Sequence, residues 1–129
     1  MIGIDTNVLL RFFQADGDSS QIESARRLIR TEAPVFVNPI VLAEFAWTLR
    51  STFKLKRAAI HDRLAGIVEA PEFSVSQPEA TGRAVAQFAT GPADFADYLV
   101  GELNVAFGCS ETVTFDKDAT KAPAFRNLS

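Results

Sequence analysis

The chain has 129 residues, of which 47% are hydrophobic and 22% charged, and its formal net charge is −3. This balance is that of an ordinary globular protein and excludes a disordered chain. Cys109 is the only cysteine, so an internal disulfide is excluded and a reducing cytosol is the expected compartment. No apolar run approaches the roughly 18 residues of a membrane span, and no charged leader precedes an apolar segment. We therefore expect one domain over residues 1–129, soluble, cytoplasmic and without a membrane partner.

The hydrophobic pattern alternates between short strands and helices along the chain. The predicted elements, in order, are a strand over 1–4, a helix over 8–13, a helix over 21–30, a strand over 35–37, a helix from 39 through 49, a helix over 56–69, a strand over 73–75, a helix over 78–90, a helix over 93–107, a strand over 112–115 and an edge strand within 123–129. Such alternation favours right-handed crossovers and a parallel sheet. We expect an α/β fold, a three-layer α/β/α sandwich with a mainly parallel sheet of four to five strands.

Acidic residues lie where strands end or helices begin. Asp5 interrupts an otherwise apolar segment after the first strand, and Asp116 ends the last clear strand. Glu44 lies near the start of the helix after the second strand, and Asp97 lies in the first turns of a later helix. The carboxyl ends of parallel strands meet at one rim of a sheet, where α/β proteins bind their ligands. We therefore expect these four carboxylates to converge on one rim.

A divalent cation is the ordinary solution to such a concentration of negative charge. Four carboxylates at one rim repel one another at a cost of several kcal/mol unless they are protonated or bound to cations. Mg²⁺ and Mn²⁺ prefer oxygen ligands, retain several waters and are held by one or two carboxylates. Such an ion lowers the pKa of a bound water and neutralises charge on phosphoryl oxygens, which suits hydrolysis of a phosphodiester.

Neutral hydrogen-bonding residues accompany the acids. Thr6, Asn7 and Thr114 are placed to orient the carboxylates or metal-bound waters. Each of them has an alternative role in satisfying the local backbone at a turn. Asp5 and Asp116 have a similar alternative as caps of the segments that follow them.

Several other catalytic classes lack their residues. His61 is the only histidine, which excludes a ribonuclease mechanism built on a pair of histidines. The sequence has no G-x-G-x-x-G, P-loop or G-x-S-x-G motif, so dinucleotide binding, the common NTPases and the α/β-hydrolases are not indicated.

Four segments together resemble the PIN-domain ribonucleases, and most closely the VapC-type toxins of bacterial toxin–antitoxin pairs. The segments are IGIDTNVLLRFF, NPIVLAEFAWTL, ADFADYLVGELNVAFGC and TVTFDKDA, and they extend over residues 1 to about 120. No one segment is specific, and their order and spacing carry the resemblance. It implies a PIN-like fold and an endoribonuclease that depends on Mg²⁺ or Mn²⁺, with Asp5, Glu44, Asp97 and Asp116 as its acidic cluster.

The resemblance also ranks the site residues. Asp5 and Asp97 are the first candidates for direct metal ligands, with Glu44 and Asp116 beside them. Asp94 lies three residues before Asp97 on one helical face and is expected to support the site. Asp118 is an outside candidate.

The partners that the resemblance implies are RNA, a second copy of the chain and an antitoxin. The substrate is RNA, with transfer RNA among the candidates, and the protein forms a homodimer whose site is blocked by a small cognate antitoxin protein. Apolar residues in excess of one small core are compatible with such interfaces. Those singled out are Phe12, Phe13, Phe45, Trp47, Leu49 and Phe53.

The basic residues are distributed unevenly. The net charge of −3 argues against a nucleic-acid partner, because phosphate binding usually leaves a basic footprint. Arg50, Lys54, Lys56 and Arg57, however, follow Glu44 closely in sequence. We hypothesise that these four residues hold the RNA backbone while bound metal supplies further positive charge. The alternative is a solvated helix face.

The sequence disfavours two other functions and leaves a third open. A haloacid-dehalogenase-like phosphatase also ends its first strand in Asp, but its chemistry needs a second Asp where this chain has Asn7. A receiver domain needs a paired acid beside Asp5 and a Lys that ends a late strand, whereas Lys117 follows Asp116 on a loop. A non-catalytic PIN-like binding module belongs to a different class, and four acids alone do not exclude it.

Overall fold

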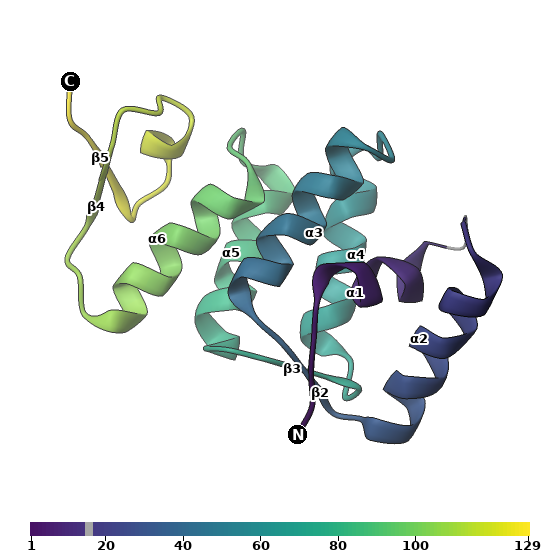
Figure 1. Ribbon diagram of the computed structural model, residues 1–129. Coiled ribbons are helices and arrows are strands. Elements are labelled where there is room, and N and C mark those ends of the chain that lie inside the picture. Colours follow the sequence, from purple (N-terminus) through teal and green to yellow (C-terminus); the bar gives the residue numbers. More distant parts are fainter. Residues whose placement is uncertain (15–16) are drawn as a thin grey trace.

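The computed structural model describes residues 1–14 and 17–129 (Figure 1). Its elements in chain order are β1 (Gly3–Ile4), α1 (Thr6–Phe13), α2 (Ser19–Glu32), β2 (Val35–Val37), α3 (Pro39–Ser51), α4 (Arg57–Glu69), β3 (Phe73–Val75), α5 (Pro78–Thr90), α6 (Phe95–Phe107), β4 (Thr112–Thr114), the 3₁₀ helix η1 (Ala119–Lys121) and β5 (Phe125–Asn127). The predicted helices and strands are all present, with ends that differ by one or two residues. The α/β fold class is confirmed.

Local sequence explains where several helices begin and end. The backbone N–H of Val8 donates to the Asp5 carboxylate at 3.1 Å, so Asp5 caps α1. Asn38 caps α3 in the same way, and Pro39 occupies the first helical position, where its missing N–H costs nothing. Gly108 ends α6 with a φ of 116°, a left-handed conformation that glycine adopts without strain.

The five strands of the described residues all pair in parallel, but they form two sheets where the sequence predicted one. The first sheet has the order β1-β2-β3, and the second contains β4 and β5. Figure 1 shows β4 and β5 beyond α6, well away from the first sheet. The strands are only two or three residues long, so each ladder contributes few hydrogen bonds. β4 leaves the far end of α6 and pairs with the next strand along the chain, as neighbouring strands commonly do.

The core lies among the helices and the first sheet. α1 contacts α2 and α3, α3 contacts α4 and α6, and α5 contacts α4 and α6. Phe12 and Phe13 of α1 pack against Phe73 of β3, and Phe13 also packs against Phe45 of α3. These rings fix the helix that follows Asp5 against the rest of the core. None of the helices in the described ranges is long and apolar enough to cross a membrane.

Candidate active site

The division of the sheet separates the predicted acids into two groups. Asp5 follows β1 of the first sheet, whereas Asp116 follows β4 of the second. The structure therefore does not form the one continuous sheet whose rim the four carboxylates were expected to share. Across residues 1–14 and 17–129, no three or more Asp, Glu, His or Cys side chains are spaced to hold a metal ion.

Asp5, Thr6 and Glu44 make up the first group, at the junction of β1, α1 and α3. The Thr6 hydroxyl donates to the Glu44 carboxylate at 2.8 Å and thereby joins the start of α1 to α3. Asp5 and Glu44 are both exposed. The capping bond from Val8 occupies Oδ1 of Asp5. Asp5 thus has the local capping role that the sequence left open, and it also presents its carboxylate to solvent.

Asp94, Asp97 and Asp116 make up the second group, around the start of α6. Asp94 occupies the N-cap position of α6, and Asp97 lies in its first turn. Burial of the Asp97 carboxyl raises its pKa above the usual value, and the negative charges of Asp116 and Asp94 raise it further. A backbone hydrogen bond at Asp94 acts in the opposite direction. The start of α6 is therefore a place where added positive charge would be stabilised.

Asp116 is held by the turn that leads into η1. Its Oδ1 accepts bonds from the backbone N–H groups of Asp118 at 2.8 Å and Ala119 at 3.1 Å. Its own N–H donates to the Thr114 hydroxyl at 3.0 Å. The Asp118 carboxylate lies 3.8 Å from the Lys121 ammonium. Thr114 and Asp116 therefore both perform the local turn roles that the sequence left open, and these bonds fix the position of the Asp116 carboxylate.

Arg50 lies beside the second acidic group. Its guanidinium pairs with the Asp94 carboxylate, so the last turn of α3 is joined to the start of α6. Both side chains are more than half exposed. The sequence placed Arg50 with the RNA-contacting residues and did not predict this ion pair.

The other basic residues differ in their surroundings. Arg57 donates from Nε to the carbonyl of Phe88 at 2.7 Å and also bonds the carbonyl of Ala93. Its guanidinium lies 4.1 Å from the centre of the Phe88 ring. Arg57 thus fixes the end of α5 to the segment before α6, while Lys54 and Lys56 are exposed. Contact of any of these residues with RNA stays a prediction.

One further acid is buried and has a structural role. Glu102 is 7% exposed, and its two carboxylate oxygens accept bonds from Arg83 and Gln87, each at 2.7 Å. A buried carboxylate requires such partners, because its desolvation is otherwise unfavourable. Glu102 therefore joins α6 to α5 and is not available to either acidic group.

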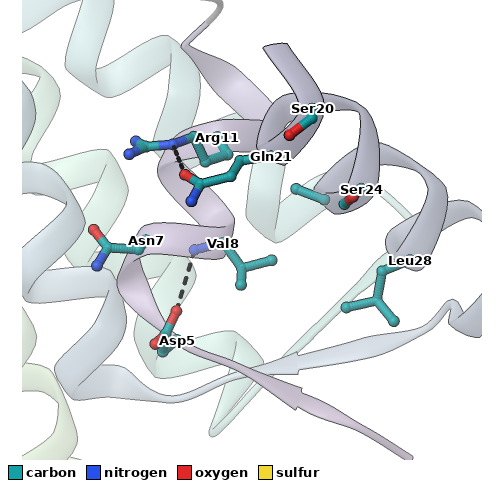
Figure 2. Close-up of a pocket in the computed structure, with 9 residues that line it drawn as sticks. Asp5, Asn7, Val8, Arg11, Ser20, Gln21, Ser24 and Leu28 are labelled. Carbon is teal, nitrogen blue, oxygen red and sulfur yellow. Dashed lines mark hydrogen bonds between the residues drawn. The ribbon is translucent and has the colours of Figure 1, made fainter. Parts of the chain in front are cut away.

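A cavity of about 520 Å³ lies between α1 and α2, next to Asp5 (Figure 2). Its lining residues are Asp5, Asn7, Val8, Arg11, Ser20, Gln21, Ser24, Ala25 and Leu28. Within it, Nε of Arg11 donates to the Gln21 side chain at 3.1 Å. Sequence reasoning did not single out Arg11. The available signal was a lone basic residue inside the apolar run VLLRFF.

The donor atoms fit a hard divalent ion that is held by few protein ligands. Both groups offer carboxylate oxygens, the ligand type that Mg²⁺ and Mn²⁺ prefer. In the described part of the chain the acids do not form a cage of three or more ligands. Mg²⁺ commonly retains several waters and takes only one or two carboxylates, so the pair of Asp97 and Asp116 is compatible with it.

Comparison with known proteins identifies the family. Residues 2–124 match the model of the PIN domain. The match covers nearly the whole chain, and the chain therefore belongs to the PIN-domain family. PIN domains are typically metal-dependent nucleases and generally use divalent metals. Comparison with curated proteins gives no match.

Proposed function

We propose that this PIN-domain protein is a metal-dependent endoribonuclease that hydrolyses phosphodiester bonds of RNA. The observation that carries the proposal is the unfavourable concentration of negative charge at the start of α6. The pKa of Asp97 is raised by its burial and by the neighbouring Asp116 and Asp94. A bound cation would remove this repulsion, and a site that holds one beside exposed carboxylates suits the chemistry typical of the family.

Asp97 and Asp116 are the proposed ligands of Mg²⁺ or Mn²⁺, with Asp5 and Glu44 as the remaining acids of the site. When bound, such an ion provides an activated water and neutralises charge on the phosphoryl oxygens. Thr6 orients the Glu44 carboxylate through the bond of 2.8 Å. Asp94 is a positioning residue in this proposal, because its carboxylate pairs with Arg50.

RNA contact is proposed for the basic residues at the end of α3 and the start of α4. Arg50, Lys54 and Lys56 are exposed, and Arg50 lies beside the second acidic group. Clustered basic side chains bind the phosphate backbone even where the net charge of the protein is negative. Arg57 begins α4, close in sequence to these residues, and would add a further contact to the RNA backbone. Transfer RNA is the candidate substrate class.

We also propose that the protein acts as a VapC-type toxin, as a homodimer that a cognate antitoxin inhibits. Of the six apolar residues singled out from the sequence, Phe45 and Leu49 are buried, and Phe12, Phe13 and Phe53 pack partly buried against the core. Trp47 is 64% exposed, and Ile40 on the same helix is 69% exposed. These two residues flank Glu44 at helical spacing, so a partner that covers them would also cover Glu44. Expression of the wild type should arrest bacterial growth, and expression of Asp97→Asn should not.

The nuclease is tested by incubating purified protein, freed of any partner, with total cellular RNA. We expect cuts at discrete sites with Mg²⁺ or Mn²⁺, and none with EDTA or with Asp5→Ala. Equal cleavage by Asp5→Ala would identify a contaminating nuclease. A folded wild-type protein that cuts nothing in the presence of metal would overturn the proposal.

A second candidate is a binding module without catalysis. The observation in its favour is that the described residues form no metal site of three ligands. The cleavage experiment discriminates the two, because a binding module would retain RNA or a protein partner without cutting RNA at any metal concentration.

A further inference from the structure

The cavity between α1 and α2 adjoins the first acidic group, but the proposed nuclease site does not account for the other residues that line it. Asp5 forms part of its wall and is also an acid of the proposed nuclease site (Figure 2). Its volume of about 520 Å³ lies within the range of small-molecule binding sites, roughly 300–1,000 Å³. A ligand in this cavity would therefore lie beside Asp5, one of the acids of the proposed nuclease site.

One face of each helix supplies the polar groups of the cavity. Asn7 and Arg11 are four residues apart on α1, and Gln21 and Ser24 are three residues apart on α2, spacings that place each pair on one helical face. Arg11 is half-buried, and its Nε is fixed by the bond to Gln21. The guanidinium is thereby held in one orientation at the cavity.

The cavity combines one cation with neutral hydrogen-bonding groups and an apolar wall. The fork of an arginine matches the oxygens of a phosphate group. Ser24 and Gln21 offer donors and acceptors for a base edge or a ribose hydroxyl, while half-buried Leu28 offers an apolar surface to a base. The acids that line the cavity or lie near Arg11 are Asp5 and Asp18, and the Asp18 carboxylate is engaged by the N–H groups at the start of α2.

Arg11 lies further along α1 than Asp5 does. Arg11 follows Asp5 by six residues, which corresponds to roughly 9 Å along a helix axis. A phosphate at Arg11 and a second phosphate at Asp5 would therefore be close enough to belong to one strand.

We infer that this cavity is a ribonucleotide subsite, in which Arg11 binds a backbone phosphate of the RNA strand near Asp5 and the α2 face contacts the attached nucleoside. The inference rests on the proposed nuclease function and adds to it a residue that positions the substrate. A single-stranded RNA segment would enter along the groove between α1 and α2, with a second of its phosphates at Asp5.

The test is a titration that does not depend on cleavage or on metal. Isotope-labelled protein in EDTA is titrated with each of the four ribonucleoside 5′-monophosphates and, separately, with inorganic phosphate, while backbone amide shifts are recorded by NMR. Arg11→Gln removes the cation. Ser24→Leu fills the cavity without touching Arg11, and leucine is well tolerated in a helix. Arg27→Gln is the matched control, because Arg27 lies on α2, pairs with Glu23 and does not line the cavity.

We expect saturable shifts at Asn7, Ser24 and Leu28 with at least one nucleotide, which should bind more tightly than phosphate alone. Arg11→Gln should weaken this binding about ten-fold, the loss expected for one charge-assisted hydrogen bond. Ser24→Leu should also weaken it, and Arg27→Gln should not.

Absence of saturable shifts, or equal affinity for phosphate and for all four nucleotides, would overturn the inference. An assay of RNA cleavage by the same wild-type sample in Mg²⁺ shows whether a failure concerns the subsite or the proposed nuclease function. A protein that cuts RNA but binds no nucleotide in the cavity contradicts the subsite alone. A protein that binds nucleotides there but cuts no RNA contradicts the nuclease alone.

Discussion

The Thr6 hydroxyl donates a hydrogen bond of 2.8 Å to the carboxylate of Glu44 across 38 positions of sequence. This bond joins the residue directly after Asp5 to the helix that carries the second acid of the first group. Asp5 and Glu44 are exposed, so packing does little to fix the Glu44 side chain. Thr6 is the group that fixes it, and a change at Thr6 tests whether the position of Glu44 matters.

Thr6→Val replaces the hydroxyl with a methyl group of similar size. Glu44 then loses a charge-assisted hydrogen bond, and we expect RNA cleavage to fall about ten-fold while the fold is retained. Thr6→Ser keeps a hydroxyl and should keep most of the activity. Cleavage rates and thermal unfolding are measured for both variants, so that a loss of activity can be distinguished from a loss of stability. Equal activity of Thr6→Val and the wild type would remove Thr6 from the site.

Asp97 should destabilise the metal-free protein at neutral pH. Its pKa in the folded protein is raised above the usual value of 3.8, so the folded state binds its proton more tightly than the unfolded state does. The contribution of Asp97 to the free energy of unfolding is therefore largest below pH 3.8 and falls as the pH rises through the raised pKa. Asp97→Asn in EDTA should be more stable than the wild type at pH 7, by less than about 1 kcal/mol because solvent screens a half-exposed group.

The advantage of Asp97→Asn should disappear as the pH is lowered below 3.8. Denaturant unfolding at several pH values measures it, with Asp62→Asn as control, because Asp62 is an exposed acid on α4. Addition of Mg²⁺ should stabilise the wild type and not Asp97→Asn, because ligand binding to the folded state adds to its stability. A variant less stable than the wild type in EDTA at pH 7 would show that burial and the neighbouring charges do not disfavour the ionised Asp97 carboxylate.

The sequence predicted the elements well because their signals are local. Asn38-Pro39 and Gly108 mark helix ends through caps that need no distant partner, and the structure has both. The prediction of a single sheet was wrong, because the choice of pairing partner depends on long-range contacts that the sequence of residues 112–114 does not indicate. The expectation that Asp5 and Asp116 share one rim rested on that sheet. The ion pair of Arg50 with Asp94 spans 44 positions and has no local signal either.

RNA contact by the basic residues predicts a specific salt dependence. Replacement of Arg50, Lys54 and Lys56 together by Ala should weaken RNA binding and make its dependence on salt shallower, by about two units of slope for three phosphate contacts to a single strand. A matched control replaces three exposed arginines of α2 by Ala, namely Arg26, Arg27 and Arg30. Filter binding over a range of salt concentrations gives both slopes. Equal slopes for the two triple variants would contradict the assignment.

Glu102 should be needed for stability and not for cleavage. Glu102→Ala leaves Arg83 and Gln87 of α5 without their buried partner, and we expect a loss of about 2 kcal/mol in the free energy of unfolding. Glu102→Gln retains a hydrogen-bonding oxygen and should lose less. Both variants, assayed below their unfolding temperatures, should cut RNA at the wild-type rate. A folded Glu102→Gln protein that cuts RNA much more slowly would place Glu102 in the site.

The most direct test of the account is RNA cleavage by Asp97→Asn beside Asp62→Asn, in Mg²⁺ and at a temperature where unfolding measurements show all proteins folded. The account predicts that Asp97→Asn loses cleavage although in EDTA it is at least as stable as the wild type, while Asp62→Asn cuts the same RNA at the same sites. Loss of function without loss of stability would assign Asp97 to the chemistry. Cleavage by Asp97→Asn at the wild-type rate would contradict the acidic site at the start of α6.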